Sequence, residues 1–376
     1  MHAGTSRAAA ARTRRSTHAA SSALCVIGVD GYVGQFIAHD ATTRRREVEV
    51  VYALGRRRGR GRDGGVDDKD DDDVTTTIKT IKTTTTVVVD VEVDVTSEAS
   101  CVEAMERVYE DATTRGVSVD MVVNCAAISS PGACEKTPEE AMAVNAPRVA
   151  WRAARDVARR RGREAPFWVQ FSTCQVYDGG RAMSDEDAGC APVNVYGRSK
   201  VACEDALAED YGDECIILRS SIITGPRPPL RAIRRTLFLE FVASTFTREE
   251  PTAFYYDEYR NPIAAADICR IVRDIGEKFA ARRVKPPRRV YNMGGPDRVN
   301  RVDMAKACAK YLARGDDELE RAYLSKVHPE TAATAAAWRG VVSPADNSMT
   351  SSALISDVCQ TWAPMSFADQ VAYAFS

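Results

Sequence analysis

The feature that most constrains the fold is an apolar run followed at once by three regularly spaced glycines. Residues 23–29 read Ala-Leu-Cys-Val-Ile-Gly-Val, and Gly28, Gly31 and Gly34 open the next segment. An unbroken apolar run of this length is typical of a buried parallel strand. Glycines at this spacing let the backbone turn tightly and approach a pyrophosphate, and the helix that follows attracts phosphate charge. We therefore expect a strand, a dinucleotide-binding turn and a helix over residues 32–40.

Strand-like and helix-like patterns alternate between residues 23 and 225, outside a low-complexity stretch at 56–86. Residues 101–112 carry apolar side chains at spacings of three and four, as one face of a helix does. Apolar runs that we expect to form further strands lie at 47–54, 87–95, 120–127, 167–172 and from 215 onward. Alternating strands and helices predict an α/β fold of the Rossmann type, with a doubly wound parallel sheet. Ligands of such sheets lie beyond the C-terminal ends of the strands.

The chain divides into three parts by composition. Residues 1–22 are rich in Arg, Ser and Ala and contain no acid, so we expect a disordered tail or an organelle transit peptide. Residues 23–225 are expected to form the NAD(P)-binding domain, interrupted by a mobile low-complexity insertion at 56–86. The pattern becomes irregular at Pro226. We therefore expect residues 226–376 to form a smaller substrate-binding lobe together with elements that return to the sheet.

The end of the second predicted strand bears on the choice of cofactor. Arg56 and Arg57 follow it, at the place where such folds meet the adenosine ribose. A carboxylate there would bond the ribose 2′-hydroxyl, whereas arginine suits a 2′-phosphate. Because no acid stands at this tip, the sequence favours NADP(H) over NAD(H).

Other predicted strand ends supply further candidates for cofactor contacts. The third strand ends at Asp94, whose carboxylate could accept a hydrogen bond from an adenine amino group, with the amide of Val95 beside it. Asn124 can brace the backbone at the end of the fourth strand, where small residues let a cofactor lie close. The full set of cofactor candidates is Gly28, Gly31, Tyr32, Val33, Gly34, Arg56, Arg57, Asp94, Val95, Asn124, Ala126 and Arg219.

A hydroxyl residue and a Tyr/Lys pair follow the fifth predicted strand. Thr173 stands at its end, and Tyr196 and Lys200 come later, four positions apart. On a helix such positions share one face, so the phenol and the ammonium can share one site. A neighbouring ammonium favours phenolate and so lowers the pKa of the phenol. Thr173 could hold a carbonyl oxygen while Tyr196 exchanges a proton with it, which is general acid-base catalysis of a hydride transfer.

Composition and charge argue against several classes of function. The 376 residues carry 51 basic and 53 acidic side chains, a balance that offers no global field for nucleic acid. No apolar run approaches the roughly 18 residues that a membrane helix requires. The 11 cysteines and 4 histidines show no metal-ligand spacing and indicate a reducing compartment without a metal site. We therefore expect a cytoplasmic protein, or an organellar one if residues 1–22 are a transit peptide.

Several longer motifs resemble one family. They are Asn124-Cys-Ala-Ala, Ser172-Thr-Cys-Gln-Val-Tyr-Asp-Gly179, Asn194-Val-Tyr-Gly-Arg-Ser-Lys200 and Ser343-Pro-Ala-Asp346. In these motifs the chain resembles the dTDP-4-dehydrorhamnose reductase-like (RmlD-like) branch of the extended short-chain dehydrogenase/reductase superfamily. Residues 218–226 and 293–298 look most like a plant and algal group related to the regulatory beta subunit of methionine adenosyltransferase. The resemblance implies that Thr173, Tyr196 and Lys200 are the reductase triad and that the glycines form the cofactor loop.

Two residues depart from the family pattern. Reductases of this branch usually carry Asp-Tyr directly after the triad threonine, where this chain has Cys174 and Gln175. The substitution removes a carboxylate from the carbonyl site and leaves the cofactor loop intact. Cys174 and Gln175 are candidates for substrate contacts, together with Arg260, which could meet a substrate phosphate.

Three functions follow from the resemblance and stay open at this point. The first is an NADPH-dependent reductase of a 4-keto-deoxysugar nucleotide, in which Tyr196 protonates the carbonyl oxygen and Lys200 holds the ribose. The second is a non-catalytic NADP-binding subunit that docks on methionine adenosyltransferase and adjusts S-adenosylmethionine synthesis. The third, an epimerase or dehydratase, ranks last, because a dehydratase needs a carboxylate where Cys174 stands. The expected partners are a nucleotide sugar or methionine adenosyltransferase, with no nucleic acid and no membrane.

Overall fold

A single large sheet lies at the centre of the molecule. The computed structural model describes residues 21–44, 48–56, 78–81, 84–233, 235–333 and 340–376. The strands of the sheet are β1 (Ser22–Ile27), β2 (Val48–Gly55), β3 (Ile78–Ile81), β4 (Thr84–Glu92), β5 (Ser118–Asn124), β6 (Phe167–Thr173), β7 (Cys215–Ser220) and β12 (Val290–Met293). They lie in the order β12-β7-β6-β5-β1-β2-β4-β3, and all are parallel except β3 at one edge. The α/β Rossmann-type fold predicted from the sequence is confirmed.

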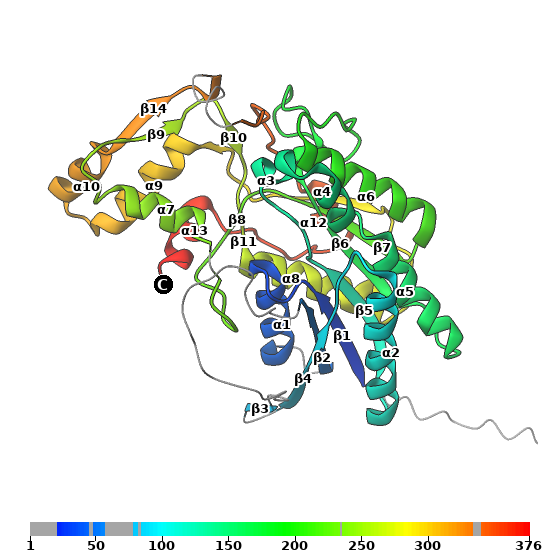
Figure 1. Ribbon diagram of the computed structural model, residues 1–376. Helices are drawn as coiled ribbons and strands as arrows, with labels where there is room; N and C mark the ends of the chain where they lie inside the picture. The colour runs from blue at the N-terminus through cyan, green and yellow to red at the C-terminus, as the bar shows by residue number, and fades with distance from the viewer. Residues whose placement is uncertain (1–20, 45–47, 57–77, 82–83, 234, 334–339) are drawn as a thin grey trace, which may run out of the picture.

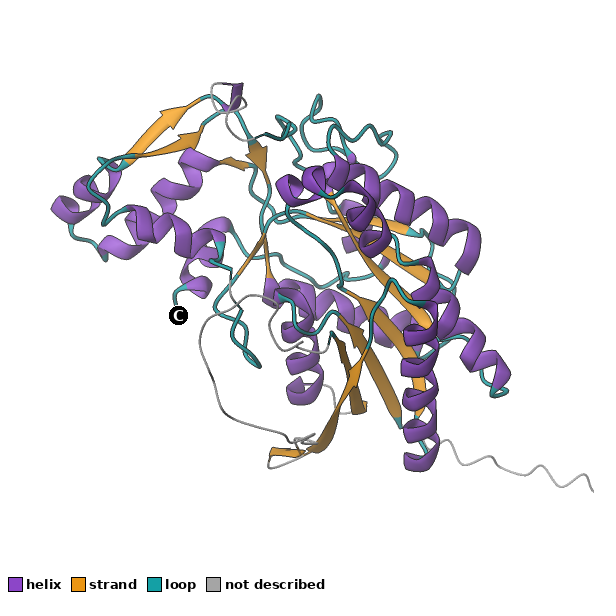
Figure 2. Cartoon of the chain, in the orientation of Figure 1, coloured by secondary structure: helices purple, strands orange, loops and turns teal. Residues whose placement is uncertain are grey.

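Helices cover both faces of this sheet (Figures 1 and 2). One face packs against α1 (Tyr32–Arg44), α8 (Ala265–Ile275) and α12 (Ser352–Asp357), and the other against α2 (Glu98–Arg115), α5 (Arg148–Arg160) and α6 (Val195–Tyr211). Along β1, Ala23, Cys25 and Ile27 enter the core with α2, while Leu24 and Val26 enter the core with α1. Both faces of β1 are therefore buried, which explains why its sequence is apolar without alternation.

Helix α2 shows how the sequence sets the ends and the buried face of an element. The Ser97 side chain accepts a hydrogen bond from the backbone N–H of Ser100, and Gly116 ends the helix with a φ of 71°. A residue with positive φ after the last turn is the common C-terminal cap, and glycine adopts it without strain. The apolar face expected over 101–112 is confirmed, since Cys101, Met105, Val108 and Ala112 are all buried.

A smaller lobe stands beside the C-terminal ends of the strands. It consists of α7 (Phe238–Thr245), β9 (Thr252–Tyr255), β10 (Tyr259–Arg260), β13 (Val299–Asn300), α9 (Arg301–Ala313), α10 (Asp317–Leu324), β14 (Val327–Glu330) and α13 (Phe367–Ala374). Leu239, Val242, Phe254 and Met304 lie in its separate apolar core. The chain passes between the lobes through the paired strands β8 (Ile223–Thr224) and β11 (Ile263–Ala264). It then returns to the large lobe as α8, β12 and α12.

Three further helical segments follow the ends of β5 and β6, whereas a fourth, which continues α8, packs against the start of β6 through Phe279 and Phe167. They are α3 (Pro131–Lys136), α4 (Pro138–Asn145), the short helix η1 (Cys174–Val176) and the wide turn η2 (Gly276–Ala280). No helix within the described ranges is both long and apolar enough to cross a membrane.

Part of the predicted insertion belongs to the sheet. We expected 56–86 to be an insertion and the third strand to begin at 87, but β4 begins at Thr84 and β3 pairs with it in antiparallel register from Ile78↔Val87 to Ile81↔Thr84. The Thr86 hydroxyl also donates to the Val48 carbonyl. β-Branched threonine favours strands, so this tract extends the sheet edge. The predictions for residues 57–77 and 1–20 fall outside the described residues, and Ser22 already belongs to β1.

Candidate functional site

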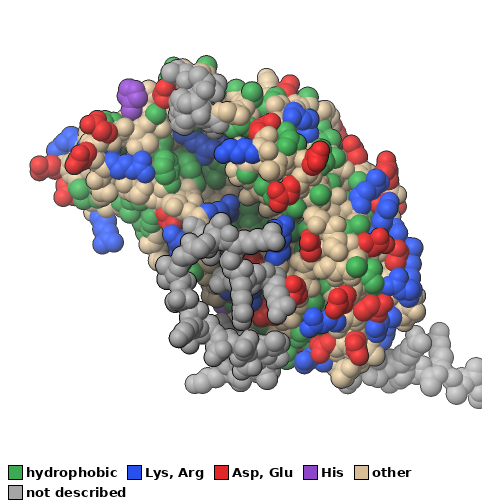
Figure 3. Space-filling model, in the orientation of Figure 1, with side chains coloured by type: hydrophobic (Ala, Val, Ile, Leu, Met, Phe, Trp, Pro, Cys, Tyr) green, Lys and Arg blue, Asp and Glu red, His purple; other side chains and the backbone are tan. Residues whose placement is uncertain are grey.

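A cavity of about 970 Å³ opens at the C-terminal ends of β1, β5 and β6, between the sheet and the smaller lobe. The loop after β1, the end of β6, the start of α6 and loops of the smaller lobe all contribute to its wall. Figure 3 shows this face of the molecule hollowed between the lobes, with hydrophobic and basic side chains at the hollow. The strand order reverses between β1 and β5, and sheets of this kind bind ligands at such a point.

The glycine loop after β1 forms one side of the cavity. Gly28 has a φ of +82°, and a Cβ atom there would lie 2.6 Å from the backbone nitrogen of Ala126. A Cβ atom on Gly34 would lie 2.5 Å from the Gly28 carbonyl oxygen. The backbone N–H of Gly28 donates to the Leu54 carbonyl at 2.8 Å. A side chain at either end of the loop would thus collide with the backbone, so glycine is required at Gly28 and Gly34. Gly31 and Gly34 line the cavity with backbone that no side chain covers, and such a wall fits a dinucleotide pyrophosphate.

Asn124 acts on the cavity through the backbone. Its Oδ1 accepts a hydrogen bond from the Ala126 N–H at 3.1 Å, and its Nδ2 donates to Gln170 Oε1 at 3.0 Å. The Asn124 side chain is fully buried, so the expected bracing role is confirmed. The neighbouring Cys125 and Ala127 line the cavity itself.

Helix α6 brings the Tyr/Lys pair to the end of β6. The Asn194 side chain caps the helix by accepting from the Gly197 N–H at 2.8 Å. A Cβ atom at Gly197 would collide with the carbonyl oxygen of Gln175, so the first turn of the helix lies directly on the segment after β6. Thr173, Tyr196 and Lys200 all line the cavity, with exposures of 5%, 8% and 2%.

The electrostatic state of Tyr196 differs from the expectation. Burial raises the pKa of Tyr196 above its ordinary value, although a hydrogen bond with Thr173 acts in the opposite direction. Lys200 donates from Nζ to the Phe171 carbonyl at 3.0 Å, and burial lowers the pKa of this ammonium. The expected lowering of the tyrosine pKa by Lys200 is therefore corrected, because the ammonium is directed at a backbone carbonyl. A protonated phenol is the form that can donate a proton to a developing alkoxide.

Cys174 and Gln175 occupy different environments beside Thr173. The Cys174 side chain is buried on the cavity wall, and burial raises the pKa of its thiol. The neutral thiol cannot replace a carboxylate as a charged group. Gln175 accepts from Asn194 Nδ2 at 2.8 Å, so it supports the residue that caps α6. Both residues line the cavity.

The two predicted arginine contacts differ: Arg219 is corrected, whereas the contact of Arg260 with substrate stays a prediction. The Arg219 guanidinium is buried and donates to Glu204 at 2.7 Å and to the Tyr177 hydroxyl at 2.9 Å, so it serves the protein interior. Arg260 reaches the cavity wall, but its donors bind the Pro344 carbonyl at 2.9 Å and the Ser343 hydroxyl at 3.0 Å. Arg260 thus holds the segment around Ser343 in place. In both cases these hydrogen-bond partners of the arginine lie on another segment of the chain, and no pattern in the sequence links that segment to the arginine.

The candidates at the second and third strand ends lie near one another. Asp94 accepts from the backbone N–H of Thr96 at 2.9 Å and from its hydroxyl at 2.7 Å, and these bonds lower the pKa of the carboxyl group. The charge of Arg56 lowers it further. Val95 is buried and Arg56 is exposed. Arg57 lies outside the described residues.

The structure adds basic residues that the motifs did not indicate. Arg235 and Arg301 line the cavity, and their guanidinium carbons lie 5.9 Å from the ring centroid of Tyr32 and 4.6 Å from that of Phe238. Tyr32 and Val33, both predicted, line the cavity as well. Arg235 lies in a basic segment without regular hydrophobic spacing. The sequence therefore could not distinguish Arg235 from the neighbouring arginines as a residue of the cavity. Arg301 is the first residue of α9, and only that position at a helix start could have indicated it.

Curated relatives match parts of the chain. A probable low-salt glycan biosynthesis reductase of Haloferax volcanii is 32% identical over 179 residues, covering 47% of this chain and 54% of the relative. The dTDP-4-dehydrorhamnose reductase of Escherichia coli is 36% identical over 112 residues, covering 29% and 35%. The methionine adenosyltransferase 2 subunit beta of Pongo abelii is 25% identical over 190 residues, covering 50% and 53%. The chain therefore spans about half or less of the length of these relatives.

Solved structures share the fold over almost the whole chain. The dTDP-4-dehydrorhamnose reductase of Bacillus anthracis, in complex with NADP, has a TM-score of 0.67 at 15% identity and covers 94% of this chain and 99% of its own. The UDP-glucose 4-epimerase of Bifidobacterium longum, in complex with NAD+ and UDP, has a TM-score of 0.65 at 15% identity, with coverage of 94% and 96%. The model of the RmlD substrate binding domain matches residues 22–364. The chain therefore belongs to the RmlD substrate binding domain family.

Proposed function

We propose that the protein is an NADP(H)-dependent reductase of a 4-keto-deoxysugar nucleotide, similar in reaction to dTDP-4-dehydrorhamnose reductase. The observation that carries the proposal is the meeting of Thr173, Tyr196 and Lys200 in one cavity with the glycine loop. The cavity also contains Arg235 and Arg301, and arginine suits the diphosphate of a nucleotide sugar. The exposed Arg56, which directly follows β2, supports the choice of NADP(H).

Three residues of the cavity have separate roles in the proposed reaction. When bound, the nicotinamide cofactor supplies the hydride to the carbonyl carbon. The Thr173 hydroxyl orients the carbonyl oxygen, and the protonated phenol of Tyr196 donates a proton to that oxygen as negative charge develops. Lys200, held by the Phe171 carbonyl, has further N–H donors with which it holds the nicotinamide ribose. Burial of all three side chains limits access of water to the proton transfer.

The test is the oxidation of NADPH with dTDP-4-dehydrorhamnose, a 4-keto-deoxysugar nucleotide, followed by absorbance. The wild type should turn over, and Tyr196→Phe should lose about 100- to 10,000-fold in kcat, the usual contribution of a general acid. A matched control is Tyr211→Phe on the same helix, whose hydroxyl donates to the Pro166 carbonyl at 2.6 Å and which should keep its activity. Equal activity of the wild type and Tyr196→Phe would remove the assigned role of the phenol.

A regulatory subunit of methionine adenosyltransferase is the second candidate. Cys174 and Gln175 favour it, because a buried thiol replaces the carboxylate of the reductase pattern while the glycine loop is kept. Subunits named methionine adenosyltransferase 2 subunit beta are also among the relatives. NADPH binding without oxidation, together with capture of methionine adenosyltransferase by the purified chain, would favour this function.

The cytoplasm is the proposed location, or an organelle if residues 1–22 act as a transit peptide, which a fluorescent fusion would decide.

A further inference from the structure

A carboxylate lies at the C-terminal end of β2, although β2 itself has no acidic residue at that end. Rossmann folds that use NAD carry an acidic residue about 20 positions after the glycine motif, where it bonds the ribose 2′-hydroxyl. Here that part of the chain is Gly55, the last residue of β2. A Cβ atom at Gly55 would collide with Oδ2 of Asp30, a residue of the glycine loop. The Asp30 carboxylate thus fills the space next to β2 that a side chain at position 55 would need.

Arg231 holds this carboxylate from the other side. Its guanidinium donates to Asp30 Oδ1 at 2.7 Å and to Asp90 Oδ1 at 2.7 Å. The position of Arg231 is fixed by its own backbone, because the N–H groups of Leu230 and Arg231 donate to Gln35 Oε1 at 3.2 and 2.6 Å. Gln35 is fully buried on α1. One arginine from the segment after β8 is therefore clamped between the glycine loop, β4 and α1.

The surroundings leave both charges accessible to a ligand. The Asp30 and Arg231 side chains are 38% and 40% exposed, and Asp30 lines the large cavity. A carboxylate suits a 2′-hydroxyl, which can donate to it, and repels a 2′-phosphate. A guanidinium suits the phosphate, to which it can donate two parallel hydrogen bonds. The two side chains of the pair thus favour opposite cofactors.

We propose that Asp30 and Arg231 together determine the choice between NAD(H) and NADP(H). Asp30 takes the place of the missing acid at the end of β2 and accepts from the 2′-hydroxyl of NAD(H). Arg231 supplies a cation for the 2′-phosphate of NADP(H), in addition to Arg56. The inference rests on the proposed function only in requiring that a nicotinamide dinucleotide binds. The inference assigns the Asp30 carboxylate to the C-terminal end of β2, where the strand itself has no acidic residue.

The experiment measures the Kd of NADH and of NADPH by calorimetry, with no sugar present. Asp30→Asn should shift the ratio of the two Kd values about tenfold toward NADPH, the size expected for one hydrogen bond to a charged group. Arg231→Gln should shift the ratio about tenfold toward NADH for the same reason. Thermal unfolding of each variant checks that the fold is kept. If Arg231→Gln does not fold, the Asp30→Asn ratio decides alone.

Asp90→Asn is the matched control. It removes the second carboxylate on the same arginine while leaving the acid at the end of β2, so the ratio should stay within about twofold of the wild type. Equal shifts in Asp90→Asn and Asp30→Asn would overturn the inference, because general charge would then explain both. Unchanged ratios in the Asp30 and Arg231 variants would also overturn it. Failure of the wild type to bind either cofactor would overturn the proposed function as well, whereas binding without reductase activity would leave this inference standing.

Discussion

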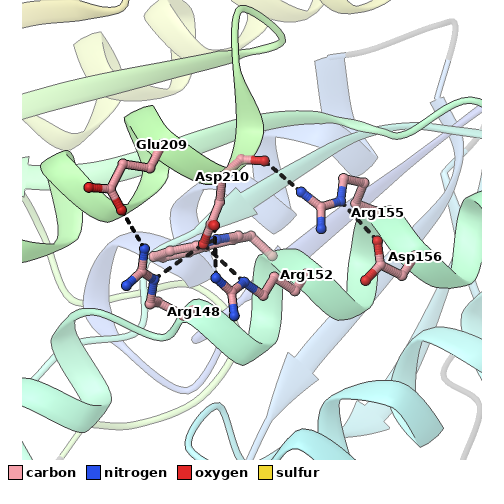
Figure 4. Close-up of polar contacts among 7 residues, drawn as sticks. Arg148, Arg152, Arg155, Asp156, Glu209 and Asp210 are labelled. Carbon is pink, nitrogen blue, oxygen red and sulfur yellow. Dashed lines mark hydrogen bonds and ion pairs between the residues drawn. The ribbon is translucent and has the colours of Figure 1, made fainter.

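Helix α6 carries two polar regions that differ in their access to solvent. Tyr196, Lys200 and Glu204 follow at four-residue spacing on its inner side, and each is at most 8% exposed. Glu209 and Asp210, near the end of the same helix, meet arginines of α5 at the surface (Figure 4). Both regions consist of charged or polar groups at short range. The groups of the first region are surrounded by protein, and those of the second are partly in contact with water. A buried group must therefore have a partner, whereas an ion pair at the surface can be lost at little cost.

On the inner side, each charge has a partner on the sheet. Glu204 binds the Arg219 guanidinium on β7 at 2.7 Å and accepts from the Ser172 hydroxyl on β6. Lys200 donates to the Phe171 carbonyl on β6. Charges removed from water require such partners, because an unpaired buried ion costs several kcal/mol. The same contacts fix the helix that presents Tyr196 to the cavity.

The contact of Glu209 and Asp210 with the arginines of α5 is called the surface seam here. Several donors in this seam share the carboxylate of Asp210. Asp210 binds Arg152 at 2.8 Å and Arg148 at 3.2 Å, and it also accepts from the Trp151 indole at 3.0 Å. Partial burial acts to raise the pKa of Asp210, but these hydrogen bonds outweigh it and lower the pKa to about 2. Because the donors are redundant and partly exposed, the loss of any one arginine leaves the carboxylate well paired.

The largest expected effect follows from breaking the inner pair. Glu204→Gln leaves the Arg219 guanidinium buried without its counter-charge, and the free energy of unfolding should fall by about 3–5 kcal/mol. Urea denaturation followed by circular dichroism measures this change. The double variant Glu204→Leu with Arg219→Met should recover most of the loss, because it removes both charges together. A loss below about 1 kcal/mol in the single variant would contradict the importance assigned to burial.

An intermediate effect is expected at the centre of the surface seam. Asp210→Asn should lower the free energy of unfolding by about 1–2 kcal/mol at pH 7, after allowance for solvent screening. The folded pKa of Asp210 lies below the ordinary value of 3.8, so its contribution is present above about pH 4 and is lost as pH falls toward 2. Urea denaturation at pH 7 and pH 3 should therefore show a smaller difference between wild type and variant at pH 3. An equal difference at both values would exclude the charge as the cause.

The smallest effect is expected from a single arginine of the seam. Arg148→Ala removes one donor to Glu209 and one to Asp210, while Arg152 and Trp151 still hold Asp210. Exposed pairs contribute little, so the thermal unfolding midpoint should not change measurably. A fall comparable with that of Asp210→Asn would show that the seam acts as one cooperative network, and it would weaken the contrast between the two sides of α6.

The fold and the cavity wall were largely predictable because they depend on local patterns. A strand covered on both faces must be apolar throughout, and β1 shows this directly in its sequence. Gly28 and Gly34 were recognisable because close backbone approach excludes any side chain at those positions. The spacing of Tyr196 and Lys200 placed both on one helix face, and both line one cavity in the structure.

The errors share a different cause, which is the choice of partner. Arg219 was assigned to the cofactor, yet Glu204 on a neighbouring helix takes its guanidinium. Arg260, a candidate for a substrate phosphate, lines the cavity as expected, but its hydrogen bond to the carbonyl of Pro344 was not predictable from spacing. The tip of β2 was interpreted as free of acid because only β2 and the residues after it were considered. Long side chains reach across elements, so their partners are set by packing.

Spacing along single segments was enough to predict the order of strands and helices, the glycine loop and the shared helix face of the tyrosine and the lysine. Three features depended on the tertiary structure: the direction in which the pKa of Tyr196 is shifted, the partner of Lys200 and the presence of the Asp30 carboxylate beside Gly55. The physical reason is that burial and ion pairing depend on contacts between segments distant in the chain. Such contacts leave no periodic trace in the sequence of either segment.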